Sequence, residues 1–163
     1  MDARIDKTLK ITTPSDLEIV MTRMFDAPRH LVFDAMTTPE HLRRWLGCTE
    51  MPMTVCEIDL RLGGAYRFTL RSPDGRDITL QGVYREIVRP ERMVFVERIV
   101  MPEFTTDEYQ VTSSFADIGG KTRLTTTILH ESKENRDGHL NSGIERGVTP
   151  AYDRLADVVA GMA

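Results

Sequence analysis

The chain has 163 residues and a formal net charge of −4, with 40% hydrophobic, 28% charged and 7% aromatic residues. This length suits one domain over residues 1–163, large enough to bury a core without disulfides or metals. A mildly acidic chain lacks the basic surface that nucleic-acid binding requires, so we expect no nucleic-acid partner. No apolar run approaches the roughly 20 residues that span a bilayer. The N-terminus has no apolar signal-peptide core, so we expect no membrane insertion and a cytoplasmic location.

The first predicted strand covers residues 17–25, which are rich in apolar and β-branched side chains. Residues 1–15 before it form either a frayed arm or a short edge strand. Two short helices follow the strand. One begins near Arg29 and carries apolar residues at helical spacing, and the other opens at Thr38-Pro39 and ends at Gly47.

Residues 51–132 contain no convincing helical pattern and break into short runs separated by turn residues such as Gly63-Gly64 and Asp74-Gly75. The pattern predicts an antiparallel meander of six strands. Alternation along the strands gives the sheet one apolar and one solvated face. The predicted strands cover residues 55–60, 65–71, 78–88, 93–101, 109–115 and 122–130.

The segment from Glu134 onward predicts a long amphipathic helix. Pro150 removes a backbone hydrogen bond and clashes with the carbonyl four residues earlier, so we expect a kink or break near Val148-Thr149. The element order predicts an α+β fold. A curved antiparallel sheet of about seven strands wraps around the long C-terminal helix, with two short helices after the first strand. The space between such a sheet and one helix is a natural ligand cavity.

The sequence offers no motif for metal or cofactor binding. The four histidines are scattered, and Cys48 and Cys56 are isolated from them, so we expect two reduced thiols. No glycine-rich nucleotide loop and no nucleophile elbow is present. We therefore expect no metal and no cofactor, and we find no catalytic signature.

Large apolar side chains at inward positions are the strongest functional indication. Inward tyrosines need partners for their hydroxyl groups, which a cavity holding water or ligand supplies. The alternative is a filled core in which the hydroxyls reach its rim. The predicted ligand-binding residues are Trp45, Tyr66, Phe68, Leu80, Tyr84, Phe95, Tyr109 and Tyr152.

Three titratable residues are candidates for a polar group at the cavity mouth: Glu86, Glu97 and His130. Each could anchor a ligand or act as a general base. Alternation places Glu86 on the same face as Tyr84. The competing interpretation is surface or strand-end pairing of these carboxylates with arginines such as Arg85 and Arg98.

Nine methionines are the one unusual feature of the composition. Methionine fills irregular gaps and is common on surfaces that accept varied partners. Core packing explains each methionine taken singly. Together with the inward aromatic residues, they favour an adaptable apolar pocket.

Several segments resemble a known superfamily. Residues 25–29 (FDAPR) and 38–45 (TPEHLRRW) resemble the opening of SRPBCC (START-like) proteins. Residues 57–64 (EIDLRLGG), 82–92 (GVYREIVRPER) and 119–125 (GGKTRLT) look like the AHSA-type branch, the homologues of the activator of the ninety-kilodalton heat-shock protein ATPase. The resemblance covers about residues 17–160 and implies a helix-grip fold around an apolar cavity. Small helix-grip proteins often pair, so it also suggests a homodimer.

Three functions follow from the pattern and the resemblance. The first is binding of a hydrophobic or aromatic small molecule, lipid- or polyketide-like, in an internal cavity. The second is an enzyme of cyclase, dehydratase or hydrolase type that acts in the same cavity and needs a positioned acid or base. The third is a stress-response or co-chaperone-like interaction module, which the sequence supports least because fold does not fix function.

Overall fold

The computed structural model describes residues 7–162 of the chain. Nine strands and four helices lie within that range. In chain order they are β1 (Lys10–Thr12), β2 (Glu18–Phe25), α1 (Arg29–Thr37), α2 (Pro39–Trp45), β3 (Met53–Ile58), β4 (Ala65–Arg71), β5 (Asp77–Val88), β6 (Arg92–Met101), β7 (Phe104–Thr105), β8 (Tyr109–Ile118), β9 (Lys121–Leu129), α3 (Lys133–Asn141) and α4 (Ile144–Met162).

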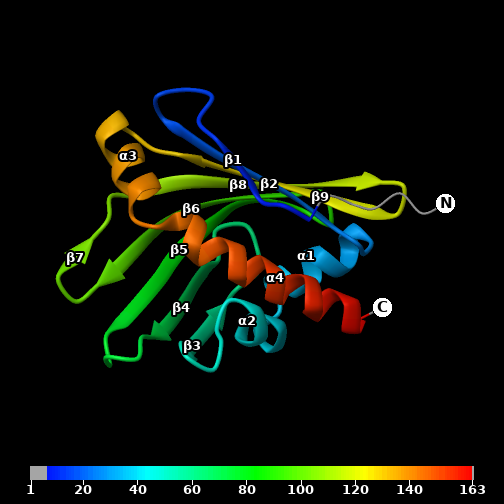
Figure 1. Cartoon of the computed structure of the whole chain (residues 1–163), viewed down its shortest axis with the longest axis horizontal. Coiled ribbons are helices and arrows are strands. Elements are labelled where there is room, and N and C mark those ends of the chain that lie inside the picture. The colour runs from blue at the N-terminus through cyan, green and yellow to red at the C-terminus, as the bar shows by residue number, and fades with distance from the viewer. Residues whose placement is uncertain (1–6, 163) are drawn as a thin grey trace.

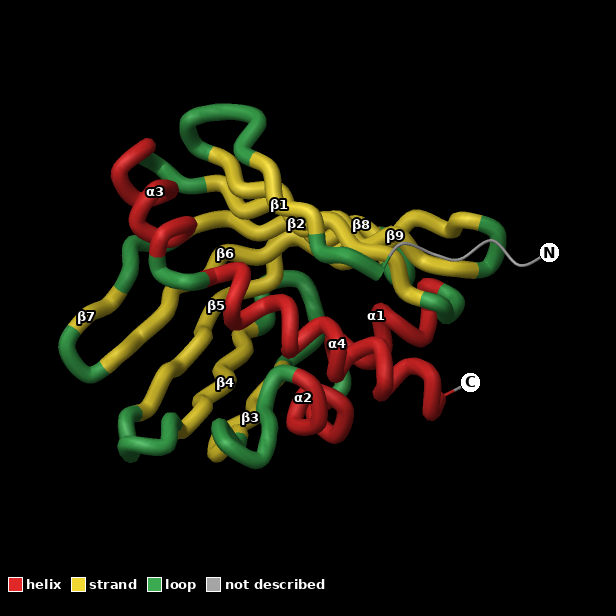
Figure 2. The backbone as a smooth tube through the Cα atoms, in the orientation of Figure 1, coloured by secondary structure: helices red, strands yellow, loops and turns green. Residues whose placement is uncertain are grey.

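The strands form one antiparallel sheet in the order β1-β2-β9-β8-β6-β5-β4-β3, and the short β7 pairs with β6. Strands β3 to β9 follow one another as a meander. The N-terminal β2 instead pairs with the last strand, with Glu18 opposite Leu129 and Phe25 opposite Thr122. Figure 2 shows the strands as one curved layer with α4 crossing it.

The face of the sheet toward α4, called here the inner face, is covered unevenly. Helix α4 buries an apolar stripe that includes Tyr152 and Leu155. Helices α1 and α2 lie beside the C-terminal half of α4 (Figure 1). There Nε of Arg154 donates a hydrogen bond of 2.9 Å to the carbonyl of Trp45. The N-terminal end of α4 lies away from α1 and α2 (Figure 1).

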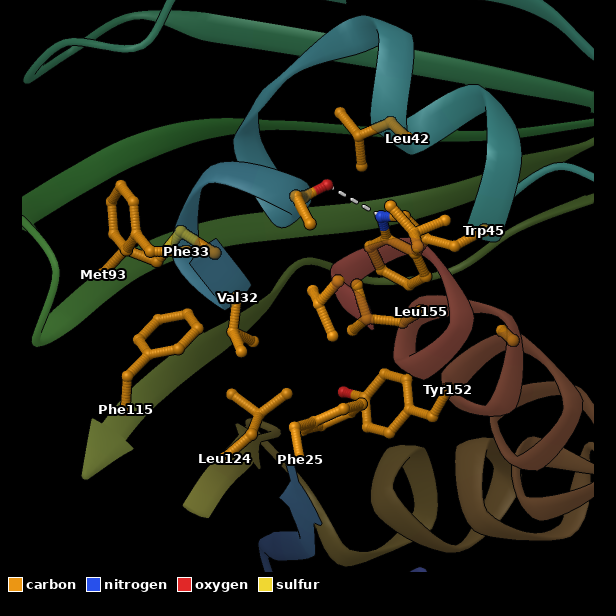
Figure 3. Close-up of a cluster of buried hydrophobic side chains, with 14 of the residues drawn as sticks. Phe25, Val32, Phe33, Leu42, Trp45, Met93, Phe115, Leu124, Tyr152 and Leu155 are labelled. Atoms are coloured by element: carbon orange, nitrogen blue, oxygen red, sulfur yellow. Dashed lines mark hydrogen bonds between the residues drawn. The ribbon is translucent and has the colours of Figure 1, made fainter. Parts of the chain in front are cut away.

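The core fills the space where α1, α2 and α4 meet the sheet (Figure 3). The indole Nε1 of Trp45 donates a hydrogen bond of 2.8 Å to the carbonyl of Ala35, which joins α2 to α1. Tyr152 packs edge-on against Phe25, with 5.8 Å between ring centroids. The fully buried members of this core include Phe25, Val32, Phe33, Leu42, Phe115, Leu124 and Leu155.

The predicted α+β fold is confirmed, with a sheet wrapped against a long C-terminal helix and two short helices after β2. All seven predicted strands are present with ends shifted by up to three residues. One strand confirms the edge-strand alternative, and one escaped prediction. β1 lies within the segment expected to be an arm or an edge strand and pairs with β2, and β7 is only two residues long.

The predicted break near Val148-Thr149 is wrong. The helix continues through Pro150, and the interruption separates α3 from α4 at Gly143. Gly143 has φ +92°, a conformation that costs glycine little because it has no Cβ. The chain therefore breaks its helix at the residue that tolerates a left-handed backbone.

None of the helices between residues 7 and 162 is long and apolar enough to cross a membrane.

Candidate functional site

All eight residues predicted to bind a ligand lie between the sheet and the helices. Seven belong to, or pack against, the main core cluster, and Tyr109 belongs to a second cluster that Phe95 also contacts. Six of the eight are at most 7% exposed, which makes much of this interior a filled core. Leu80 and Phe95 are only half-buried. Ligand contact by these residues stays a prediction.

One partly accessible region of the inner face is a short strip on β5 and β6. Sheet register places Leu80 opposite Ile99, Gly82 opposite Glu97, and Tyr84 opposite Phe95. Paired residues in an antiparallel sheet share a face, so these side chains are neighbours. The half-buried side chains Leu80, Phe95, Glu97 and Ile99 are called here the inner strip.

Glu97 lies at the centre of the inner strip and binds two tyrosines. The hydroxyl of Tyr66 on β4 donates to Oε2 at 2.5 Å, and the hydroxyl of Tyr109 on β8 donates to Oε1 at 2.7 Å. One carboxylate oxygen therefore accepts from β8, which pairs with β6, and the other accepts from β4, which lies beyond β5. Glu97 is thus the hydrogen-bond partner of two inward tyrosine hydroxyl groups.

Gly82 makes room for this network on the strand between Tyr66 and Glu97. A Cβ built at position 82 would lie 2.7 Å from the Tyr66 hydroxyl oxygen and 2.0 Å from the carbonyl oxygen of Val96. Real Cβ atoms do not approach other atoms so closely. The Tyr66 side chain thus occupies space that any residue larger than glycine would take.

Burial dominates the electrostatics of the network. It raises the pKa of Glu97, while the two tyrosine hydrogen bonds oppose that rise by stabilising the carboxylate. Burial, followed by the charge of Glu97, raises the pKa values of Tyr66, Tyr84 and Tyr109. The tyrosines therefore stay protonated as donors, and the carboxyl is the titratable group that a ligand would meet.

His130 lies at the far side of Tyr109 and pairs with a histidine that the sequence did not connect to it. Its Nε2 is 2.9 Å from Nδ1 of His139 on α3. Both imidazole rings lie 5.0 Å from the Tyr109 ring, measured between centroids. Burial lowers the pKa of His139 to about 4, with a further contribution from His130. His130 therefore lies where α3 packs against the sheet, whereas Glu97 lies in the inner strip.

Glu86 does not share the face of Tyr84, contrary to the expectation from alternation. A register shift between Tyr84 and Glu86 adds one residue to β5 and turns Glu86 to the outer face. There it forms an ion pair with Arg92, whose Nη2 is 2.5 Å from Oε1. Glu86 thus follows the competing interpretation, in which the carboxylate pairs with an arginine at the surface.

Arg23 is a buried cation on the inner face that the sequence analysis did not identify. It is 4% exposed, lies 3.2 Å from the Asp153 carboxylate of α4, and donates to the Lys7 carbonyl at 2.8 Å. Within residues 7–162 its Nη1 atom has no hydrogen-bond partner. The sequence signal for its inward position was its spacing of two residues from Phe25, because residues two apart on a strand share a face. Arg23 links β2 to α4 through its ion pair with Asp153 and lies outside the inner strip.

A groove of about 380 Å³ lies on the outer face of the sheet, over β3 to β6. Its lining includes the paired residues Glu57, Arg67, Gln81 and Arg98, which alternate with the inward residues of the same strands. A smaller hollow of about 180 Å³ includes Met101 and Pro102 in its lining. Both hollows are separate from the inner strip.

The methionines lie in different parts of the fold. Met21, Met53 and Met93 are buried in the two core clusters, so packing accounts for them. Met24 pairs with Arg123 on the outer face of the sheet. Met1 lies outside the described residues.

Comparison with known proteins identifies one family over most of the chain. The family described as "Activator of Hsp90 ATPase homolog 1-like protein" matches residues 26–160. No curated protein matches the chain. The family match covers α1 to nearly the end of α4 and so includes every element of the site.

Solved bacterial structures share the fold. A Rhodobacter sphaeroides protein is 26% identical with a TM-score of 0.85, and the alignment covers 94% of this chain and 99% of that one. A Mycobacterium smegmatis protein is 21% identical with a TM-score of 0.84, covering 96% and 100%. An Arthrobacter aurescens protein is 22% identical with a TM-score of 0.81, covering 93% and 91%.

Proposed function

Since the chain belongs to the family of Activator of Hsp90 ATPase homolog 1-like proteins, within the SRPBCC superfamily of typically ligand-binding domains, we propose that it binds a hydrophobic or aromatic small molecule on the inner face of its sheet. The observation that carries the proposal is the inner strip. Leu80, Phe95 and Ile99 are apolar yet half-buried, and they surround a carboxyl group that the sheet has enclosed on both sides with tyrosines.

The strip has the composition of a small-molecule site. Such sites combine apolar and aromatic walls with a few convergent polar groups that fix the orientation of the ligand. Here the walls come from β4, β5 and β6, and the polar group is Glu97. The Tyr84 hydroxyl adds another polar group, since it forms no hydrogen bond within residues 7–162.

A screen of hydrophobic compounds by thermal shift and native mass spectrometry tests the proposal. A ligand at about 100 times its Kd stabilises a folded protein by about 2.7 kcal/mol, so a hit should raise Tm by several degrees and add one ligand mass. Phe95→Ala should weaken binding about tenfold because it removes an aromatic wall of the inner strip.

Val96→Ala is the matched control, since Val96 neighbours Phe95 on β6 but faces outward. It should leave the affinity within about twofold of the unmodified protein. Equal losses in the two variants, or a screen without any saturable ligand, would contradict the proposal.

An enzyme is the second candidate function, because Glu97 faces inward and burial raises its pKa. A carboxyl group with a raised pKa suits general acid or base catalysis near neutral pH. Turnover of a bound compound that Glu97→Gln abolishes would favour this candidate. A homodimer, a co-chaperone role and a cytoplasmic location stay predictions.

A further inference from the structure

The two hydrogen bonds of Glu97 favour its carboxylate form, against the burial that raises its pKa. Both of its oxygens accept from tyrosine hydroxyls, at 2.5 and 2.7 Å. Hydrogen bonds from hydroxyl groups to an ionised carboxylate are stronger than those to a neutral carboxyl, so this pair of donors stabilises the charged form. The two donors come from separate strands of a rigid sheet, so the site is organised in advance to hold this charge.

The charge has no counter-ion among the described residues. No lysine, arginine or histidine within residues 7–162 forms an ion pair with Glu97. The buried arginine of the inner face, Arg23, pairs with Asp153 instead. A partly buried carboxylate without a cation is unfavourable, because two hydrogen bonds replace only part of its hydration. A cation that arrives with a ligand would relieve this penalty.

Aromatic rings pack around Tyr66, the residue whose hydroxyl binds Glu97. The Tyr66 ring lies 4.9 Å from Phe68, 5.3 Å from Tyr84 and 5.6 Å from Phe95, measured between centroids. The faces of such rings carry partial negative charge and attract ammonium groups, with the strongest effect where water is excluded. Tyr66, Phe68 and Tyr84 are buried, so among these rings the half-buried Phe95 is the one that a ligand cation near Glu97 could contact.

We propose that the inner strip selects ligands that carry a protonated amine on an apolar body, with the ammonium group bound to Glu97 and the apolar body against Leu80, Phe95 and Ile99. This inference rests on the proposed function and specifies the chemical class of its ligand. It excludes anionic lipids as preferred ligands, since a carboxylate would repel their head groups.

Three probes with the same apolar body test the inference: naphthylmethylamine, naphthylmethanol and naphthoate. In calorimetric titrations at pH 7 the amine should bind at least about tenfold more tightly than the alcohol, and naphthoate should bind weakest. Glu97→Gln keeps the size of the side chain but removes its charge. It should abolish the preference for the amine while leaving the affinity for the alcohol within about twofold.

Glu86→Gln is the matched control, because Glu86 lies on the outer face of the neighbouring strand and pairs with Arg92. It should bind all three probes as the unmodified protein does. The comparison of probes on the unmodified protein is decisive even if Glu97→Gln fails to fold. Equal or tighter binding of the alcohol or naphthoate overturns the inference and leaves the proposed function standing. Binding of none of the three also overturns it, whereas the proposed function fails only if the wider screen is empty as well.

Discussion

Gly82 determines whether the Tyr66–Glu97 contact can form. Its position on β5 lies between Tyr66 on β4 and Glu97 on β6 in the sheet register. Glycine usually weakens a strand because it has no side chain to pack, and it often marks the close approach of another group. Here that group is the hydroxyl end of Tyr66. The loss in strand packing is offset by a buried hydrogen bond to a carboxylate.

Gly82→Ala should therefore destabilise the protein by about 2–4 kcal/mol, since the new methyl group must displace both Tyr66 and the backbone of β6. Urea unfolding followed by circular dichroism measures the change. Gly138→Ala on α3 is the control, because a Cβ there meets no atom within 4 Å. It should stabilise the protein by about 0.5–1 kcal/mol through helix propensity. A neutral Gly82→Ala variant would contradict the packing described for Tyr66.

At the level of elements, α3 is held to the sheet mainly by polar contacts. Arg136 donates to the carbonyls of Ser15 and Glu18, at 2.6 and 3.3 Å. The imidazole of His139 meets that of His130 and the ring of Tyr109. An element attached through few apolar side chains is among the first to open locally. The stability of this attachment should depend on the charge of the two histidines.

Acid should destabilise the protein through His139. Its pKa is about 4 when folded and 6.5 when unfolded, so between these values the unfolded chain binds more protons and stability falls as pH falls. Between pH 7 and pH 4.5 the free energy of unfolding should fall by about 1–2 kcal/mol less in His139→Gln than in the unmodified protein, as measured by urea unfolding.

Two comparisons isolate this effect. At pH 8 the histidine is neutral in both states, so the variant's pH slope there should match that of the unmodified protein. Glu97 acts in the opposite direction, because its pKa is raised on folding and its contribution is lost as pH rises. An unchanged acid slope in His139→Gln would show that the histidine pair does not govern this part of the curve.

On the scale of the whole molecule, the pairing of β2 with β9 joins the two ends of the chain. Eight residue pairs connect these strands from Glu18↔Leu129 to Phe25↔Thr122. Helix α4 then packs across the inner face against α1 and α2. A domain whose N-terminal strand β2 pairs with its last strand β9 should unfold as one unit, as the predicted single domain requires.

Trp45 is the only tryptophan and reports on this cooperativity. It contacts Tyr152 of α4 and donates to Ala35 of α1, so its fluorescence follows the docking of the helices. Its urea unfolding curve should coincide with that of the sheet measured by far-ultraviolet circular dichroism. Separate midpoints for the two signals would contradict a single cooperative domain.

Local patterns of the sequence determined the elements and most of their faces. Strand alternation placed Tyr66, Phe68 and Phe95 inward, and helical spacing placed Tyr152 and its neighbours against the sheet. These properties depend on residues close in sequence, since side chains alternate along a strand and recur every three or four residues along a helix. Prediction of the fold class needed little more.

Only the tertiary structure decided which residues meet. Glu97 joins Tyr66 and Tyr109, 31 and 12 positions away in sequence, because the sheet register brings their strands together. One extra residue in β5 turned Glu86 outward, and Gly143 rather than Pro150 interrupted the helix. Register, bulges and helix ends depend on the balance of packing over the whole chain. The periodicity of a single segment therefore identified Glu97 as a candidate, but it could not show that two tyrosines enclose it.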